Sequence, residues 1–192
     1  MRIALGLEYD GSPYFGWQLQ AGQPSVQGVV ETALAHIAGH PVRVHCAGRT
    51  DTGVHASMQV IHFDCPEHRP DTAWVRGGNS HLPDSVTVLW AKTISEDFHA
   101  RFCAMGRHYR YVLFNRPIRS ALLAGKAGWY HRPLDADRMA EAAHHLIGEH
   151  DFTSFRAAGC QAKSPVKSLS AARVRREGDS VIFEFSANAF LH

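Results

Sequence analysis

The order of two apolar periodicities along residues 2–92 constrains the fold of this chain more than any other feature. Residues 2–9 alternate between apolar and other side chains, which is typical of a half-buried strand. Residues 26–38 carry apolar side chains at helical spacing, with Ser25 placed to cap the helix and Gly39 to end it. Further patterns predict a second helix at 71–81 and strands at 42–46, 57–64 and 86–92.

This order of elements begins a second time after residue 106. A strand is expected at 107–115, a helix at 135–147, and a hairpin of two strands at 168–176 and 180–187. The second series lacks the last helix and strand of the first, and the sequence stops within an apolar segment. We therefore expect the natural chain to continue with an α-β element.

The order β-α-β-β-α-β predicts a split βαβ unit, in which helices cover one face of an antiparallel sheet and the other face stays open. The fold class expected is thus α+β, with two RRM-like (ferredoxin-like) βαββαβ units. The first unit is expected to span residues 1–97. The second, incomplete unit is expected to span residues 98–192.

Composition excludes several classes of protein. Hydrophobic residues make up 45% and charged residues 20% of the 192 residues, which is ordinary for a globular protein with a real core. No apolar run approaches the roughly 20 residues that a membrane-spanning helix needs. The N-terminus has no signal-peptide architecture, so a cytoplasmic protein without membrane contact is expected.

The side chains that commonly bind metals are scattered along the sequence. None of the four cysteines, Cys46, Cys65, Cys103 and Cys160, belongs to a Cys-x-x-Cys pair. Structural zinc sites usually take their ligands from closely spaced pairs, so no metal site is expected and the cysteines are interpreted as reduced thiols. The 14 histidines are also dispersed and are interpreted as surface or structural residues.

The net charge of +2 is too small to indicate nucleic-acid binding by itself, but basic residues gather in two segments. The first holds Arg107, His108, Arg110, Arg116 and Arg119, and the second holds Lys163, Lys167, Arg173, Arg175 and Arg176. Charge alone leaves two interpretations open. These segments are either solvated strand faces or a surface that binds phosphate groups.

The segment from Gly48 to Ala56 has an unusual composition for a loop between two strands. Arg49 and Asp51 lie two residues apart between glycines, which allow tight turns and the close approach of a bulky ligand. An ionised aspartate beside an arginine is a competent nucleophile. The alternative is a structural turn in which Asp51 caps backbone N–H groups and pairs with Arg49.

This segment, Gly-Arg-Thr-Asp-Thr-Gly-Val-His-Ala, resembles the catalytic motif of the TruA family of tRNA pseudouridine synthases. Other family motifs are resembled in the same order along the chain. They are Tyr9-Asp10-Gly11, Gly16-Trp17-Gln18, Val26-Gln27-Gly28 with Glu31, Asn79-Ser80 with Leu82-Pro83, Phe98-His99-Ala100-Arg101, Tyr109-Arg110-Tyr111, Asp151-Phe152-Thr153-Ser154-Phe155 and Asn188-Ala189-Phe190.

The resemblance implies an isomerase that converts uridine to pseudouridine at positions 38, 39 and 40 of the tRNA anticodon stem-loop. The implied fold places two sheets around a central RNA-binding cleft. Uracil is detached, rotated and rejoined through carbon, so atoms are neither gained nor lost and no cofactor or metal is expected. Because a stacked uridine is inaccessible, it has to flip out of the stem, and recognition would rest on shape and phosphate contacts.

The resemblance also assigns roles to three residues. Asp51 matches the family's nucleophile. Tyr109 matches its active-site tyrosine, whose ring would stack on uracil and whose hydroxyl would take part in proton transfer. Arg49 is expected to bind substrate by pairing with phosphate or by filling the gap left by the flipped uridine, or else to hold Asp51. Lys163 and Lys167 are further candidates for RNA contact.

Two family features are not read directly from this sequence. In the family, the catalytic aspartate pairs with a further basic residue that lies beyond the Asn-Ala-Phe motif. No residue of this sequence is assigned that role. The family acts as a homodimer bridged by RNA. Trp74, Trp90 and Trp129 are candidates for such an interface, although core packing explains tryptophans more often.

Two other functions compete with this interpretation. A non-catalytic protein built from two RRM-like units would instead display paired aromatic side chains on its central strands. A hydrolase that used Asp51 with His55 as its base would usually need a second carboxylate or a metal cluster, and no recognisable motif supplies either.

Overall fold

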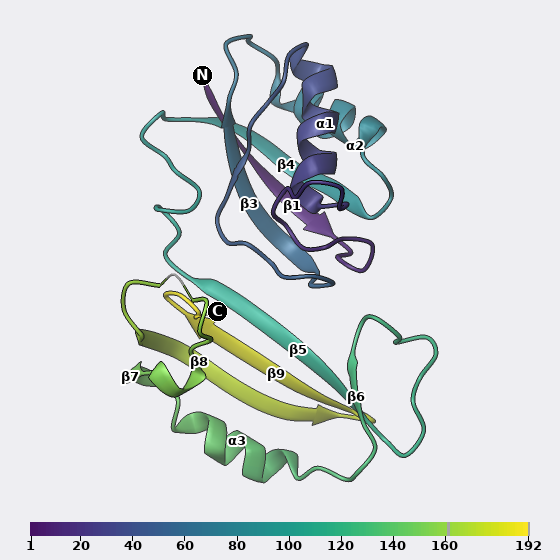
Figure 1. Cartoon of the computed structure of the whole chain (residues 1–192), viewed down its shortest axis with the longest axis vertical. Helices are drawn as coiled ribbons and strands as arrows, with labels where there is room; N and C mark the ends of the chain where they lie inside the picture. The colour runs from purple at the N-terminus through teal and green to yellow at the C-terminus, as the bar shows by residue number, and fades with distance from the viewer. Residues whose placement is uncertain (161, 192) are drawn as a thin grey trace. The chain divides into compact units, whose positions relative to one another are not determined.

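The computed structural model, drawn in Figure 1, describes residues 1–160 and 162–191. The chain separates into two compact units, Met1–Ala104 and Met105–His192. Both units combine antiparallel strand pairs with a few helices, so the predicted α+β class is confirmed.

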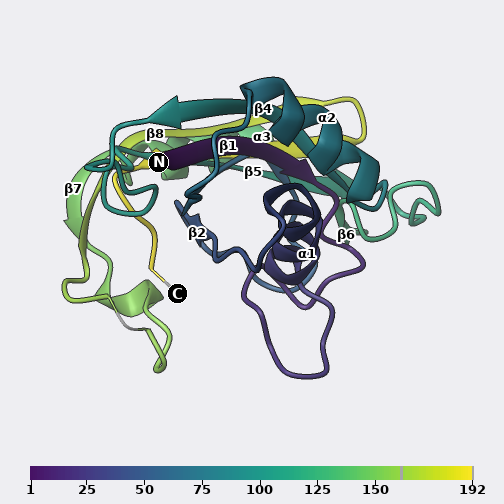
Figure 2. The same ribbon diagram turned by 90° about the horizontal axis from the view of Figure 1, so that it is seen from above.

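The first unit has the predicted order β-α-β-β-α-β. Its elements are β1 (Arg2–Tyr9), α1 (Val26–Ala38), β2 (His45–Cys46), β3 (Ala56–Asp64), α2 (Asp71–His81) and β4 (Val86–Ile94). The strands form one antiparallel sheet in the order β2-β3-β1-β4. The long loop of residues 10–25 lies between the end of β1 and the start of α1 (Figure 2).

Helix α1 begins and ends as its sequence predicts. The Ser25 hydroxyl accepts a hydrogen bond of 3.2 Å from Gly28 N at the N-terminus, and Gly39 adopts a left-handed φ of 81° at the C-terminus. Helix α2 keeps its full predicted length although it contains Gly77 and Gly78. A Cβ on either glycine would lie 3.1 Å from a side-chain atom of Ile37 or Val88, so these glycines allow close packing against α1 and β4.

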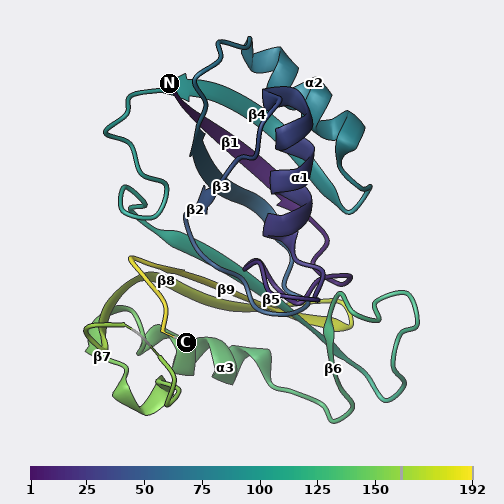
Figure 3. The same ribbon diagram turned by 45° about the horizontal axis from the view of Figure 1, so that its top comes forward.

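Both helices pack on the same face of the sheet (Figure 3), where the odd-numbered residues of β1 are buried. Trp17, Trp74 and Phe63 are almost inaccessible to solvent, and the rings of Phe63 and Trp74 meet edge to face at 5.0 Å. Burial of such large apolar side chains is the main stabilising contribution to a unit of this size.

The predicted strand at 42–46 is mostly wrong, because only His45 and Cys46 pair with β3. Residues 42–44 lie beside α1 instead, where Val44 N donates a 3.0 Å hydrogen bond to Glu31 Oε1. Val42 and Val44 remain buried, so the alternating pattern reflects core packing without strand pairing.

Residues 98–104 belong to the first unit, and the division between the units therefore lies beyond the expected boundary after residue 97. Arg2 Nη1 donates a 2.8 Å hydrogen bond to Phe98 O, and Ala100 N donates one of 3.1 Å to His62 Nδ1. These bonds fasten the segment after β4 to strands β1 and β3, on the face that α1 and α2 leave open.

The second unit is built on a five-stranded sheet in the order β6-β5-β9-β8-β7. Its elements are β5 (Arg107–Asn115), β6 (Gly128–Tyr130), α3 (Ala136–His144), β7 (Gly148–Asp151), a 3₁₀ turn (Thr153–Phe155), β8 (Val166–Glu177) and β9 (Ser180–Ala187). The predicted first strand and the predicted hairpin are confirmed. Gly178 takes a left-handed φ of 55° in the hairpin turn.

Three features of the second unit differ from the prediction. Strands β6 and β7 were not expected, since segments of three and four residues are too short to show a period. Strand β6 runs parallel to β5, so this sheet is mixed. Helix α3 ends at His144 instead of residue 147, because a turn leads into Gly148, whose φ of 108° starts β7.

Candidate active site

The Asp51 loop, residues 47–55, connects β2 to β3 in the first unit. Its two predicted functional residues, Arg49 and Asp51, are both exposed to solvent. The loop is firmly held at its start, because the buried side chain of Gln59 on β3 hydrogen-bonds both Gly48 N and Gly48 O. Ala47 N also donates to Val60 O at 2.8 Å.

Thr50, which lies between Arg49 and Asp51, is fixed by two buried aromatic residues. Trp17 N donates a 2.9 Å hydrogen bond to Thr50 O. The Tyr9 hydroxyl lies 2.8 Å from Thr50 Oγ1. Since Trp17 and Tyr9 are only 1% and 2% exposed, the residue next to the carboxylate is tied directly to the core.

Asp51 begins a tight turn. Val54 N donates a 3.1 Å hydrogen bond back to Asp51 O, and Gly53 adopts a left-handed φ of 76° that favours glycine. Gly53 N donates to Tyr14 O at 3.3 Å. The turn therefore presents Asp51 at the surface while its backbone is held by the loop that follows β1.

That neighbouring loop approaches so closely that it requires glycine at two positions. A Cβ on Gly11 would lie 2.1 Å from Val54 O, and one on Gly16 would lie 2.7 Å from Thr50 O. Both contacts are with backbone atoms, which cannot give way as a flexible side chain can. These glycines near Asp51 thus serve backbone-to-backbone packing between two loops.

His55 closes the far end of the Asp51 loop. Its Nδ1 lies 3.0 Å from both Gly11 N and Asp10 Oδ1, so this nitrogen joins the two loops. The hydrolase interpretation gave His55 the role of a base. The contacts of Nδ1 fix the orientation of this ring and hold the two loops together.

Cys46 lies at the start of the same loop and is a second potential nucleophile. Burial raises the pKa of its thiol to about 11, although the charge of Arg49 acts in the opposite direction. Only the thiolate is strongly nucleophilic, so this cysteine is inert near neutral pH. Asp51 is thus the better candidate for covalent chemistry in this loop.

Tyr109 lies in the second unit, at the third position of β5, and its side chain is 40% exposed. It pairs with Phe185 of β9 across the sheet, and its ring meets that of Phe190 edge to face at 4.8 Å. Phe190 belongs to the Asn-Ala-Phe motif, so the structure brings two of the quoted motifs together. The tyrosine ring is held by aromatic contacts and remains accessible to a ligand.

Several of the basic residues in the two arginine-rich segments have partners within the second unit. Glu184 accepts hydrogen bonds from Arg110 at 2.6 Å and from Arg175 at 2.5 Å. These arginines lower the pKa of the Glu184 carboxyl, with Arg110 as the larger cause. Arg173 and Lys163 are exposed, so this part of the surface is partly paired and partly open for phosphate contacts.

The sequence singled out Arg49 and Asp51, which the structure places in one exposed loop, but it did not indicate the residues that support this loop. Tyr9, Trp17 and Gln59 fix the loop, yet none was predicted to have that role. Tyr9 and Trp17 belong to two of the quoted motifs, but the sequence does not show which residues they contact.

The first unit is thus a split βαβ unit that presents an exposed carboxylate on a turn held by hydrogen bonds and flanked by glycines, as a candidate enzyme active site would. A sequence model of the family described as tRNA pseudouridine synthase matches residues 7–103 and 142–192. The chain belongs to the tRNA pseudouridine synthase family. Asp51 lies within the matched part, whereas Tyr109 lies in the stretch between the two matched segments.

Curated relatives carry the more particular name tRNA pseudouridine synthase A. The protein of that name from Dechloromonas aromatica is 60% identical over 192 residues, which is 100% of this chain and 73% of the relative. The one from Aromatoleum aromaticum is also 60% identical with the same coverage. The one from Coxiella burnetii is 55% identical over 190 residues, or 99% of this chain and 73% of the relative.

Proposed function

We propose that this protein isomerises uridine to pseudouridine at positions 38–40 of the tRNA anticodon stem-loop, with Asp51 as the nucleophile. Membership in the family and the relatives named tRNA pseudouridine synthase A support the reaction class. The observation that carries the proposal is the Asp51 loop, which presents a carboxylate at the surface on a backbone tied to the core.

An exposed, braced carboxylate suits a substrate that is itself large and folded. A flipped uridine enters the site from the RNA, so the protein has no need to enclose the carboxylate beforehand. Bracing keeps the nucleophile in one position, which matters because a misplacement of about 1 Å can cost roughly a hundredfold in rate. The hydrogen bonds to Thr50, Gly53 and Val54 supply that support.

The direct test is a pseudouridine assay on unmodified tRNA with Asp51→Asn, which keeps the shape of the side chain and removes its charge. We expect turnover to fall below detection while tRNA binding stays within a few-fold of wild type. Asp84→Asn is the matched control, because Asp84 is an exposed loop carboxylate of the same unit. Retained turnover in Asp51→Asn would remove this residue from the nucleophile role.

The same assay distinguishes the enzyme from an RNA-binding protein without catalytic activity. Isomerisation leaves the mass of the RNA unchanged, while chemical labelling of pseudouridine detects the new bond. Tight tRNA binding with no pseudouridine from the wild-type protein would support the non-catalytic alternative. Release of a base or cleavage of the strand would support a hydrolase.

Tyr109 is proposed to bind the target uracil by stacking, and its hydroxyl to assist proton transfer. Its 40% exposure and its position on a strand support a ring that is accessible yet fixed in orientation. Tyr109→Phe removes only the hydroxyl, and Tyr109→Ala removes the ring as well. A rate that falls in both variants supports proton transfer, whereas a fall only in Tyr109→Ala leaves stacking. Tyr111→Phe is the matched control.

Arg49 is proposed to bind the RNA next to the target, by pairing with phosphate or by occupying the space of the flipped base. Its exposure, two residues from Asp51 in the same loop, supports this role. Arg49→Ala should weaken tRNA binding, and loss of a phosphate contact should also reduce the salt dependence of binding. A variant that binds normally but turns over slowly would instead favour a role in holding Asp51.

The expected homodimer and the cytoplasmic location are also proposals. Of the three tryptophans considered for an interface, Trp74 is fully buried in the core, Trp90 on β4 is partly buried, and Trp129 on β6 is 47% exposed. Trp129 is therefore the candidate, and Trp129→Ser should shift a dimer towards monomer in sedimentation experiments. No helix among residues 1–160 and 162–191 has the length and apolar character needed to cross a membrane.

A further inference from the structure

Three side chains with metal-binding atoms converge in the first unit, at the end of β3 opposite the Asp51 loop. Strand β3 starts directly after that loop and spans nine residues, so its two ends lie about 26 Å apart. Cys65 and Glu67 follow its last residue. His40 comes from the turn that ends α1. The cluster is therefore separate from the proposed active site.

The distances between the three ligand atoms suit a tetrahedral ion. His40 Nε2 lies 2.9 Å from Glu67 Oε2, and Cys65 Sγ lies 3.3 Å from the same oxygen and 3.9 Å from His40 Nε2. Zinc bonds of about 2.3 Å to sulfur and 2.0–2.2 Å to nitrogen or oxygen place tetrahedral ligand atoms about 3.4–3.6 Å apart. Each observed separation differs from that geometry by no more than about 0.5 Å.

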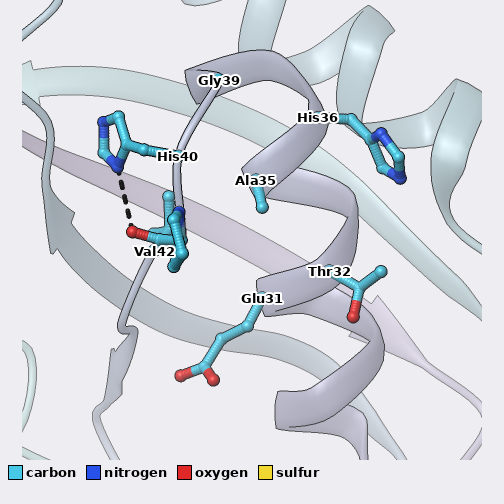
Figure 4. A pocket seen from close by; sticks show the side chains of 8 residues that line it. Glu31, Thr32, Ala35, His36, Gly39, His40 and Val42 are labelled. Atoms are coloured by element: carbon cyan, nitrogen blue, oxygen red, sulfur yellow. Dashed lines mark hydrogen bonds between the residues drawn. The ribbon is translucent and has the colours of Figure 1, made fainter.

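The His40 ring is oriented as a metal ligand would be. Its Nδ1 lies 2.9 Å from Pro41 O, as the dashed line in Figure 4 shows, and this contact turns Nε2 towards Cys65 and Glu67. Histidines that bind metals usually donate their second ring N–H to a carbonyl or carboxylate, which fixes the ring. Pro41 O provides such a carbonyl in this site.

The surroundings combine a buried anchor with access from solvent. Cys65 is almost fully buried, whereas the side chains of His40 and Glu67 are 34% and 43% exposed. The pocket in Figure 4 is lined in part by Glu31, His36 and His40, so it shares His40 with the cluster. An ion can therefore enter, and a water molecule has room to bind it from the solvent side.

We infer that His40, Cys65 and Glu67 form a binding site for Zn²⁺, with water as the fourth ligand. Thiolate, imidazole and carboxylate are the three donor types that zinc takes in proteins. The thiolate and the carboxylate together neutralise the charge of the ion. The Zn²⁺ ion would replace two protons, the thiol proton of Cys65 and the proton shared between His40 and Glu67.

A bound ion would connect the C-terminus of α1 to the segment between β3 and α2. Ligands that bind only the folded state stabilise it in proportion to the logarithm of their concentration over Kd. The sequence did not indicate this site, because His40 lies 25 residues before Cys65 and a single Cys-x-Glu follows. The inference is independent of the proposed isomerase activity.

The experiment uses the whole, untagged protein after treatment with a chelator. Zn²⁺ is titrated by calorimetry, and Co²⁺ is used as a spectroscopic probe. We expect one ion per chain and a thiolate-to-cobalt charge-transfer band in the near ultraviolet. Loss of a ligand should cost more than the roughly 10- to 100-fold typical of outer-shell changes, so Cys65→Ser and His40→Gln should bind at least about a hundredfold more weakly.

Matched controls keep these results specific. Cys103→Ser removes an exposed thiol, and His36→Gln removes a nearby histidine on helix α1, so both should bind zinc as the wild type does. Because Cys65 is buried, Glu67→Gln provides a variant with little risk to folding. Zinc should raise the Tm of the wild type and not that of Glu67→Gln.

Two outcomes would overturn the inference. One is a cobalt complex without a thiolate band. The other is zinc uptake that Cys65→Ser and Glu67→Gln leave unchanged. In either case the three residues would form a hydrogen-bonded cluster only. Pseudouridine formation by Glu67→Gln should match the wild type, so this test and the test of the proposed function fail separately.

Discussion

Each of the two units of this chain combines one sheet with helices, but the units differ in the size of the side chains that fill their cores. The first unit buries tryptophan, phenylalanine and branched aliphatic side chains to within 2% exposure. The second unit's core is made largely of alanines with Leu169, Val174 and Val181. Buried area sets the stabilisation, so the first unit is expected to be the more stable.

The difference follows the distribution of proposed roles. The proposed nucleophile, Asp51, belongs to the unit with the larger core, where Tyr9 and Trp17 connect the Asp51 loop to buried side chains. The second unit carries an exposed tyrosine and a sheet surface with arginine–glutamate pairs. A reacting group needs a rigid support, whereas a surface that binds a large RNA tolerates more adjustment.

The largest expected effect would come from the core of the first unit. Trp74→Ala removes a fully buried ring that packs against Phe63, and it should lower the free energy of unfolding by about 3–5 kcal/mol. Val181→Ala makes a smaller cavity in the second unit and should cost about 1–2 kcal/mol. Urea denaturation followed by tryptophan fluorescence and circular dichroism measures both. Equal losses would break the proposed contrast between the units.

Acid should destabilise the first unit through His62, which lies on β3 on the face opposite the helices. Burial lowers the pKa of His62 to about 4, and the nearby charges of His99 and His45 act in the same direction. The unfolded chain then binds more protons than the folded one between about pH 6.5 and pH 4. Stability is therefore complete above about pH 6.5 and is lost as the pH falls towards 4.

The loss should be on the order of 2–3 kcal/mol for a shift of this size. Unfolding in urea at a series of pH values measures it. His62→Asn retains an acceptor for the hydrogen bond from Ala100 N and removes the titration, so its stability should vary less over this range. If the free energy of unfolding of that variant changed with pH as steeply as that of the wild type, the pH dependence would belong to other groups.

A moderate effect is expected where the two loops of the site meet. Gly11→Ala would place a Cβ 2.1 Å from Val54 O, and overpacking of this kind costs about 1–3 kcal/mol. The shifted backbone should also reduce turnover, because it displaces the turn that carries Asp51. Gly159→Ala in the second unit meets nothing within 4 Å and serves as the control. A fully active Gly11→Ala would show that the bracing is not needed.

The smallest effect is expected on the charged surface of the second unit. Glu184→Gln weakens the pairs with Arg110 and Arg175, whose side chains are 63% and 41% exposed. Exposed ion pairs contribute little to stability, so the Tm should change by only a few degrees. A much larger fall in Tm would show that these ion pairs stabilise the second unit more than their exposure suggests.

Much of the fold could be predicted from the sequence because its longer elements follow clear periods. The apolar patterns place six elements correctly, namely α1, α2, β1, β3, β4 and β5. Gly39 marks the end of α1, and Gly178 marks the turn between β8 and β9. Strands β6 and β7 could not be predicted, since three or four residues form no period and their pairing depends on distant partners.

The site shows the same limit. Arg49 and Asp51 could be singled out because they are two charged residues between glycines, within a motif that resembles a known catalytic motif. Tyr9 lies 41 residues from Thr50, and no pattern in a single chain indicates that their hydroxyls meet. The His40–Cys65 pair was missed for a similar reason. Long-range contacts between chemically ordinary residues become visible only in three dimensions.

The bracing of the Asp51 loop has a consequence for how the protein can change. The atoms that hold the turn at Thr50, Gly53 and Val54 are mostly main-chain N–H and carbonyl groups, which every residue except proline provides. The side chains at positions 52 and 54, both exposed, therefore do not hold Asp51, the proposed nucleophile, in place. Natural variation or directed evolution can change these two side chains while the backbone that positions Asp51 is kept.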